Sequence, residues 1–253
     1  MKLQQPLLNK MSKITDRIFT HNQDFSAIAL EVFRFQSANN PVYKQFLSLI
    51  GCQISKITRI DQIPFLPVEL FKSQHIYCSE KKPEITFSSS GTGDEGQSKH
   101  EVADLGIYER SIKEGFENFY GDLNQYHFFG LLPAYLERSG SSLIYMVNKL
   151  MEWSGGNAEF HLYDHKKLMD SISKARSLGK KPFLIGVSFA LLDLAEGLSP
   201  DLSDVIVMET GGMKTHRREI SRDEMHQRLS EAFEIPLQAV HSEYGMTELL
   251  SQA

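Results

Sequence analysis

The chain has 253 residues, of which 41% are hydrophobic and 23% charged, and its formal net charge is −5. This composition is ordinary for a soluble globular protein, and the acidic balance argues against a dedicated nucleic-acid binder. No apolar run reaches the roughly 18 residues that a membrane-spanning helix needs, and the polar N-terminus lacks the apolar segment of a signal peptide. The two cysteines, Cys52 and Cys78, are too few for a disulfide framework, so we expect a cytoplasmic protein with reduced thiols.

The first 80 residues have a helical pattern. Asp24 precedes apolar residues at helical spacing, which predicts a capped helix, and Asn40-Pro41 begins a second helix that Gly51 ends. The prolines within 63–67 predict a rigid extended link, because each removes a donor and restricts the residue before it. We therefore expect a helical N-terminal region over 1–80 that packs on a core formed by 81–253.

Strand and helix patterns alternate in the rest of the chain. We expect strands over 126–132, 159–163, 182–187, 205–208 and 239–241, separated by helices over 105–119, 143–151, 164–178, 190–196 and 221–233. Mostly apolar strands alternating with helices predict an α/β fold with largely parallel sheets flanked by helices. In such folds ligands bind at the carboxyl ends of the strands.

Three loops that follow predicted strands carry unusual chemistry, and the first is Ser88-Ser89-Ser90-Gly91-Thr92-Gly93-Asp94. Its small residues let the backbone turn sharply and direct N–H groups and hydroxyls toward an anion. Lys99 and His100 close this stretch. From composition alone, the loop can be a phosphate cradle or a solvated linker.

The second loop, 209–214, contains Gly211-Gly212, which suits either close passage of the backbone along a flat ligand or an ordinary tight turn. The third is Tyr244-Gly245-Met246-Thr247-Glu248. A Tyr ring can stack on a base, a Thr hydroxyl can bond a phosphate oxygen, and a Glu carboxylate can ligate Mg²⁺. Taken separately, these residues also suit strand-end packing, a helix cap and a first-turn helix charge.

Together the three loops resemble those of the adenylate-forming superfamily, which includes the acyl-CoA synthetases. Ser-Ser-Gly-Thr-Gly-Asp with a downstream Lys is similar to the phosphate loop of that superfamily, and 244–248 matches its Tyr-Gly-x-Thr-Glu motif without a mismatch. The Ser-Lys-His ending of the first loop and Glu-Thr-Gly-Gly-Met-Lys look most like the LuxE-type acyl-protein synthetase branch. The resemblance implies the large N-terminal domain of an adenylate-forming enzyme.

The resemblance also implies ATP and Mg²⁺ as cofactors and a carboxylic acid, of the fatty-acid class, as substrate. The acid is activated as an acyl-adenylate and passed to a protein cysteine, with an acyl-reductase or acyltransferase protein as partner. The residues implied in nucleotide binding are Ser89, Ser90, Gly91, Thr92, Gly93, Gly211, Gly212, Met213, Lys214, Tyr244, Gly245 and Thr247. The catalytic candidates are Lys99, His100, Thr247 and Glu248, of which Glu248 is also the metal ligand.

Within this set, 89–93 cradle the β- and γ-phosphates, Gly211 and Gly212 lie along the adenine, and Tyr244 packs on it. Thr247 bonds the α-phosphate. Candidates for an acyl pocket are apolar residues that suit a core equally well, namely Phe128, Phe129, Leu131, Leu132, Val187, Phe189 and Met246.

Two departures from the family pattern leave alternatives open. Gly93 stands where a second hydroxyl is usual, and Asp94 puts a carboxylate where the family has Gly. The sequence ends at Ala253, whereas family members continue into a small domain that carries a catalytic Lys and, in acyl-protein synthetases, the acceptor cysteine. We therefore expect weak or absent overall turnover. The alternatives are an aryl- or acyl-CoA ligase and a nucleotide-binding or scaffold protein without turnover.

Overall fold

The computed structural model describes residues 14–20, 24–79, 81–89, 96–132, 140–156, 159–161, 163–197, 202–211 and 220–252. Contacts divide the chain into two compact units. The first unit comprises Met1–Thr86 with Ser90–Ile107, and the second comprises Phe87–Ser89 with Tyr108–Ala253. The domain boundary at residue 80 that the sequence suggests stays a prediction.

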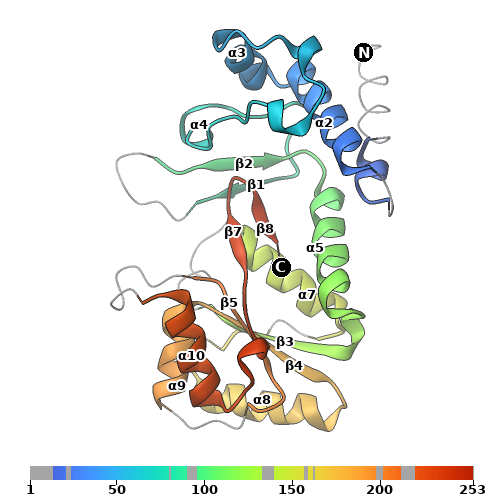
Figure 1. Cartoon of the computed structure of the whole chain (residues 1–253). Coiled ribbons are helices and arrows are strands. Elements are labelled where there is room, and N and C mark those ends of the chain that lie inside the picture. Colours follow the sequence, from blue (N-terminus) through green and yellow to red (C-terminus); the bar gives the residue numbers. More distant parts are fainter. Residues whose placement is uncertain are drawn as a thin grey trace. The chain divides into compact units, whose positions relative to one another are not determined.

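In the first unit, helices precede two short strands. In chain order its elements are α2 (Phe25–Asn39), α3 (Pro41–Leu49), the 3-10 turns η1 (Ile54–Lys56) and η2 (Ile60–Gln62), α4 (Leu70–Ser73), β1 (Ile85–Ser88), whose last two residues belong to the second unit, and β2 (Lys99–Val102) (Figure 1). Both expected helices are confirmed with their caps, because the side chains of Asp24 and Asn40 accept hydrogen bonds from first-turn backbone N–H groups.

The buried core of this unit joins α2 to α3. Phe33, Tyr43 and Leu47 form it, and the rings of Phe33 and Tyr43 meet edge to face at 6.2 Å. The Tyr43 hydroxyl donates to the Pro64 carbonyl at 2.6 Å, which ties the proline link to the helices. Burial raises the pKa of Tyr43 to about 12, so this hydroxyl stays protonated.

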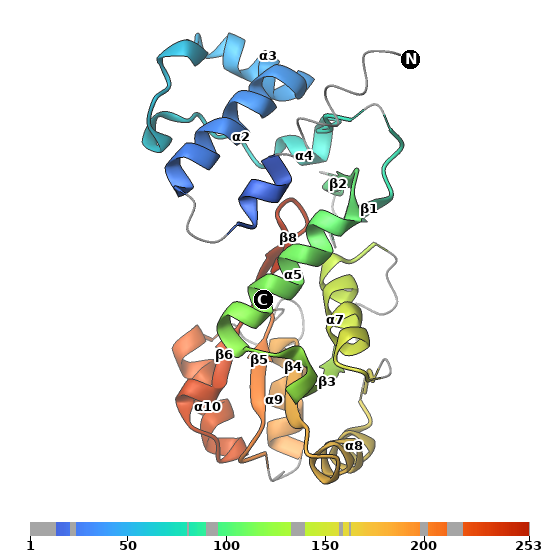
Figure 2. The ribbon, with the colours of Figure 1, turned by 90° about the vertical axis from the view of Figure 1, so that its right-hand side faces the viewer.

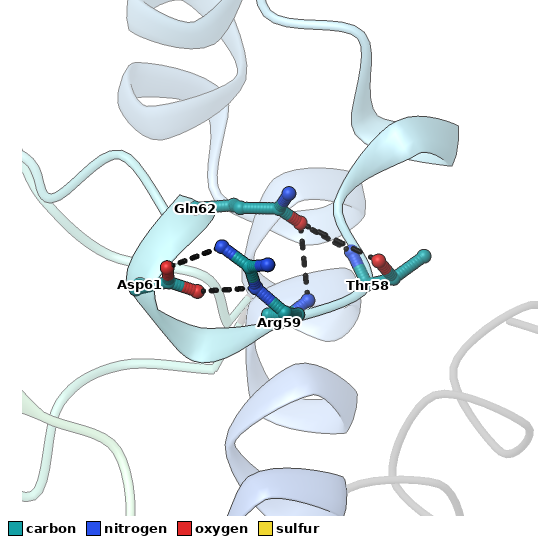
Figure 3. Close-up of polar contacts among 4 residues, drawn as sticks. All are labelled: Thr58, Arg59, Asp61 and Gln62. Atoms are coloured by element: carbon teal, nitrogen blue, oxygen red, sulfur yellow. Dashed lines mark hydrogen bonds and ion pairs between the residues drawn. The ribbon is translucent and has the colours of Figure 1, made fainter.

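An exposed polar turn, which we call the Gln62 turn, lies between α3 and the proline link. Gln62 Oε1 accepts hydrogen bonds from the backbone N–H groups of Thr58 (3.0 Å) and Arg59 (3.1 Å) (Figure 3). Beside it the Arg59 guanidinium donates twice to Asp61, at 3.0 and 2.6 Å. All four side chains come from one five-residue segment, so the turn closes only a local piece of chain.

The second unit alternates strands and helices. Its elements are α5 (Leu105–Tyr120, whose first three residues belong to the first unit), η3 (Leu123–Gln125), β3 (Tyr126–Leu131), α7 (Ser142–Trp153), α8 (His165–Ser177), β4 (Lys181–Gly186), α9 (Ser188–Gly197), β5 (Ile206–Glu209), α10 (Arg222–Phe233), η4 (Leu237–Ala239), β6 (Val240–Ser242), β7 (Tyr244–Met246) and β8 (Leu250–Gln252). These bounds confirm the expected helices and all but one of the expected strands to within a few residues.

Strands β3, β4, β5 and β6 form a parallel sheet in that order. The predicted α/β fold with a parallel sheet flanked by helices is therefore confirmed. The strand expected over 159–163 is wrong for the described residues there, since Phe160 forms only one isolated bridge, to Gly130. Polar Glu159 and His161 flank that bridge, and Asp164 caps α8 directly afterwards, so the chain leaves the sheet edge.

The sheet has different neighbours on its two faces (Figures 1 and 2). Helix α5 covers one face, where the Phe116 ring lies 5.2 Å from that of Phe128 and 5.6 Å from that of Phe183. Helices α9 and α10 cover the other face. On this face Gly186 of β4 has no side chain to separate the strand from α9. A Cβ on Gly186 would lie 2.8 Å from Leu191 Cγ, so glycine is what lets α9 approach β4 this closely.

Candidate functional site

The carboxyl ends of β4, β5 and β6 bring polar residues together at one edge of the parallel sheet. Gly186, the last residue of β4, is in register with Glu209, which in turn pairs with Ser242 at the end of β6. Ser188 begins α9 directly after β4. Parallel strands end at a common edge, so loops far apart in the sequence start side by side here.

The Glu209 side chain is the centre of this group. It is 7% exposed, and its Oε2 accepts hydrogen bonds from Ser188 Oγ (3.0 Å) and from the Gly211 backbone N–H (2.8 Å). Its Oε1 accepts from Ser242 Oγ at 2.6 Å. We call Ser188, Glu209, Gly211 and Ser242, together with His226, the Glu209 cluster. Three donors satisfy a carboxylate that burial would otherwise destabilise.

His226 on α10 completes the cluster. Its Nε2 lies 3.0 Å from Ser242 Oγ and 3.7 Å from Glu209 Oε1. Because Ser242 donates its only proton to Glu209, the Ser242 oxygen is left to accept from His226 Nε2–H. The hydrogen bonds therefore run from His226 through Ser242 to Glu209. The sequence analysis missed this chain, and its one visible signal was a carboxylate closing an otherwise apolar strand.

The loop after β5 begins with Thr210 and Gly211. Gly211 has a φ of +71°, a conformation that favours glycine, and this agrees with the sharp change of direction expected there. Thr210 Oγ1 is buried and has no hydrogen-bond partner among the described residues. Gly212, Met213 and Lys214 lie outside the described residues.

The segment from Tyr244 to Glu248 forms a hairpin instead of the start of a helix. Strand β7 pairs antiparallel with β8, and Thr247 and Glu248 occupy the turn between them. The alternative readings of Thr247 as a helix cap and Glu248 as a first-turn helix charge are therefore wrong. Strand-end packing of Tyr244 is also wrong, because 77% of this residue is exposed. The chain after β6 thus forms a short hairpin that carries the Tyr244 ring, Gly245, Thr247 and Glu248.

The residues expected in the phosphate loop fall into three groups. Ser89 directly follows β1, and Ser90, Gly91, Thr92 and Gly93 lie outside the described residues. Lys99 and His100 are the first two residues of strand β2 in the first unit, directly after this loop. The His100 ring packs 5.6 Å from the Phe71 ring of α4, since alternate residues of β2 face the helix.

Most acyl-pocket candidates are deeply buried. At most 5% of each is exposed for Phe128, Phe129, Leu131, Leu132, Val187 and Phe189. Such burial is what the core interpretation expects, whereas Met246 is half-buried on β7. Burial also raises the pKa of the Cys78 thiol, which disfavours the thiolate that an acyl acceptor needs.

No three His, Cys, Asp or Glu side chains among the described residues are arranged to hold a metal ion. Protein sites for Mg²⁺ often use one or two carboxylates together with substrate phosphates, so Glu248 stays a prediction. None of the described helices is long and apolar enough to cross a bilayer. No protein-family model and no curated protein matches this chain.

Proposed function

We propose that this protein binds ATP at the carboxyl edge of its parallel sheet and activates a carboxylic acid as an acyl-adenylate, which it passes to a protein cysteine. The observation that carries the proposal is the common origin of two motif loops. The Gly211 loop leaves the end of β5, the Tyr244–Glu248 segment leaves the end of β6, and these strands are neighbours. Gly211 and Tyr244, which are 33 residues apart in sequence, thus both follow strands at the edge where α/β proteins bind ligands.

In the proposed reaction a carboxylate oxygen attacks the α-phosphorus of ATP, the bond from that phosphorus to the bridging oxygen breaks, and pyrophosphate leaves. The exposed Tyr244 ring would pack on the adenine, and the Thr247 hydroxyl would donate to an α-phosphate oxygen. Glu248 would hold Mg²⁺, which neutralises phosphate charge so that one anion can approach another. The roles of Lys99 and His100 stay predictions from the sequence.

Calorimetry with ATP and Mg²⁺ tests the proposal. We expect Thr247→Ala and Glu248→Gln to weaken binding by about 10- to 100-fold, because each loses a charge-assisted contact. Leu249→Ala is the matched control, since this side chain lies in the same hairpin turn and is 56% exposed. Absence of binding by the unaltered protein, or equal loss in all three variants, would contradict the proposal.

A second experiment separates the possible products. The protein is incubated with ATP, Mg²⁺ and a fatty acid, and hydroxylamine traps any acyl-adenylate as a hydroxamate. Even a small amount of trapped hydroxamate supports acid activation, since weak turnover is expected, and formation of acyl-CoA when CoA is added would favour the CoA-ligase alternative. Nucleotide binding without hydroxamate would favour the alternative without turnover.

A further inference from the structure

We propose that Glu209 is a positioning residue that joins the start of α9, the loop after β5 and the end of β6, and so fixes the backbone at the carboxyl edge. The consequence for ATP affinity rests on the proposed function. The joining itself rests only on geometry, because Glu209 contacts Ser188, Gly211 and Ser242 directly.

The side-chain bonds reinforce main-chain bonds between the same three segments. The backbone N–H of Ser188 donates to the Gly211 carbonyl at 2.8 Å, and that of Thr210 donates to the Gly186 carbonyl at 3.0 Å. The Glu243 N–H donates to the Glu209 carbonyl, also at 2.8 Å. Strand pairing ends at this point, so these bonds and the Glu209 side chain are what continue the alignment into the loops.

The saturation of the carboxylate argues for joining rather than for contact with a ligand. Both Glu209 oxygens already accept hydrogen bonds, and only 7% of the residue is exposed. An amide can keep this arrangement. Its oxygen can accept from Ser188 and Gly211, while its NH₂ group donates to Ser242, whose hydroxyl turns to donate to His226 Nε2 in the other tautomer of that ring. Positioning therefore predicts that Glu209→Gln behaves like the unaltered protein, whereas a role for the charge predicts that it does not.

The experiment compares Glu209→Ala, Glu209→Gln and the control Ser230→Ala by hydrogen exchange and by ATP calorimetry. Ser230 Oγ donates to the Ile235 carbonyl beyond the end of α10, and its loss removes one hydrogen bond away from the carboxyl edge. For Glu209→Ala we expect the Ser188, Thr210 and Gly211 amides to exchange at least about tenfold faster than in the unaltered protein. We also expect ATP to bind about tenfold more weakly. In Glu209→Gln and Ser230→Ala both quantities should stay within about twofold of the unaltered protein.

The other outcomes of these measurements would overturn either the joining role of Glu209 or its effect on ATP binding. Unchanged exchange in Glu209→Ala would overturn the joining role, and so would equal disruption in Glu209→Gln. Faster exchange with unchanged ATP affinity would overturn the positioning role at the nucleotide site. If the unaltered protein binds no ATP, the proposed function fails while the exchange comparison still decides the joining role. If Glu209→Ala does not fold, Ser242→Ala removes one arm of the cluster and the same two measurements apply.

Discussion

The Gln62 turn and the Glu209 cluster each gather donors around one side-chain acceptor, and they differ in burial and in what they join. Gln62 is exposed and accepts from residues three and four positions away. Glu209 is buried and contacts Ser188 and Ser242, which are 21 and 33 residues away. Water can replace the donors of Gln62, whereas nothing replaces those of Glu209. The comparison teaches that burial and sequence separation, more than the number of bonds, decide what a polar cluster contributes.

The largest loss of stability is expected when the buried acceptor, Glu209, is removed, and the matching change at the exposed acceptor is Gln62→Ala. Glu209→Ala leaves a buried hydroxyl and a backbone N–H without their acceptor, so we expect the free energy of unfolding to fall by about 2–4 kcal/mol. Gln62→Ala should cost under about 1 kcal/mol, because water reaches the released N–H groups. Trp153, the only tryptophan in the sequence, lies in the second unit and reports its unfolding by fluorescence in urea.

Hydrogen exchange at the Thr58 and Arg59 amides reports the corresponding change in the first unit. Equal losses of stability in the two variants would contradict the comparison, because burial would then have no effect.

A somewhat smaller effect is expected where α9 approaches the sheet beside the Glu209 cluster. A Cβ added at Gly186 would lie 2.8 Å from Leu191 Cγ and 3.2 Å from Leu131 Cβ, so Gly186→Ala should destabilise the second unit by about 1–3 kcal/mol. Gly115→Ala is the matched control, since a Cβ there meets no described atom within 4 Å. In the middle of α5 it should instead stabilise by about 0.5–1 kcal/mol. Urea unfolding followed at Trp153 measures both, and losses of similar size would contradict the packing argument.

Most of the fold could be predicted because its signals are local. Caps such as Asp24, Asn40 and Asp164 stand beside the helices that they begin, and apolar runs mark β3, β4 and β5. The segment around Phe160 shows the limit of this reasoning. It has a strand-like composition, but whether it pairs beyond one bridge depends on the sheet edge and on the early start of α8, which no local pattern contains.

The candidate site was predictable only in part, for a related reason. Gly211 and Tyr244 belong to short motifs that can be read residue by residue. The joining of Ser188, His226 and Ser242 through Glu209 depends on strand register, which brings together residues that the sequence keeps 16 to 54 positions apart. The hairpin at Thr247 was missed because the motif was also compatible with a helix start.

The pH dependence of stability tests a buried polar group that, unlike Glu209, is poorly paired. His161 is 4% exposed, and its Nε2 lies 3.5 Å from Glu159 Oε2, but neither ring nitrogen makes a hydrogen bond among the described residues. Burial lowers the pKa of His161. In the unfolded chain this histidine is protonated below about pH 6.5, whereas in the folded protein it is protonated only at lower pH. Stability should therefore fall as the pH drops from 7.5 to 5.5.

Urea unfolding followed at Trp153 at both pH values, for the unaltered protein and for His161→Asn, measures this loss. The variant cannot titrate, so its stability should fall less over the same range. Glu159 does not interfere in this window. Although its burial favours the protonated form, hydrogen bonds from His127 and Ser171 keep the pKa of Glu159 below its usual value. Identical pH profiles for the two proteins would contradict the assignment to His161.

The smallest effect is expected at the ion pair of the Gln62 turn. The side chains of Arg59 and Asp61 are 68% and 61% exposed, so Asp61→Asn should leave the Tm unchanged within error. The hydrogen bond from Arg59 nonetheless lowers the pKa of Asp61, and an NMR titration of Arg59→Gln should show that pKa moving back up toward its ordinary value. A contact can thus shift the pKa of a carboxyl group without stabilising the fold, because water hydrates both side chains when the ion pair breaks. A clear loss of Tm in Asp61→Asn would mean that an exposed, local cluster contributes as a buried one does, and the distinction drawn from Glu209 would not hold.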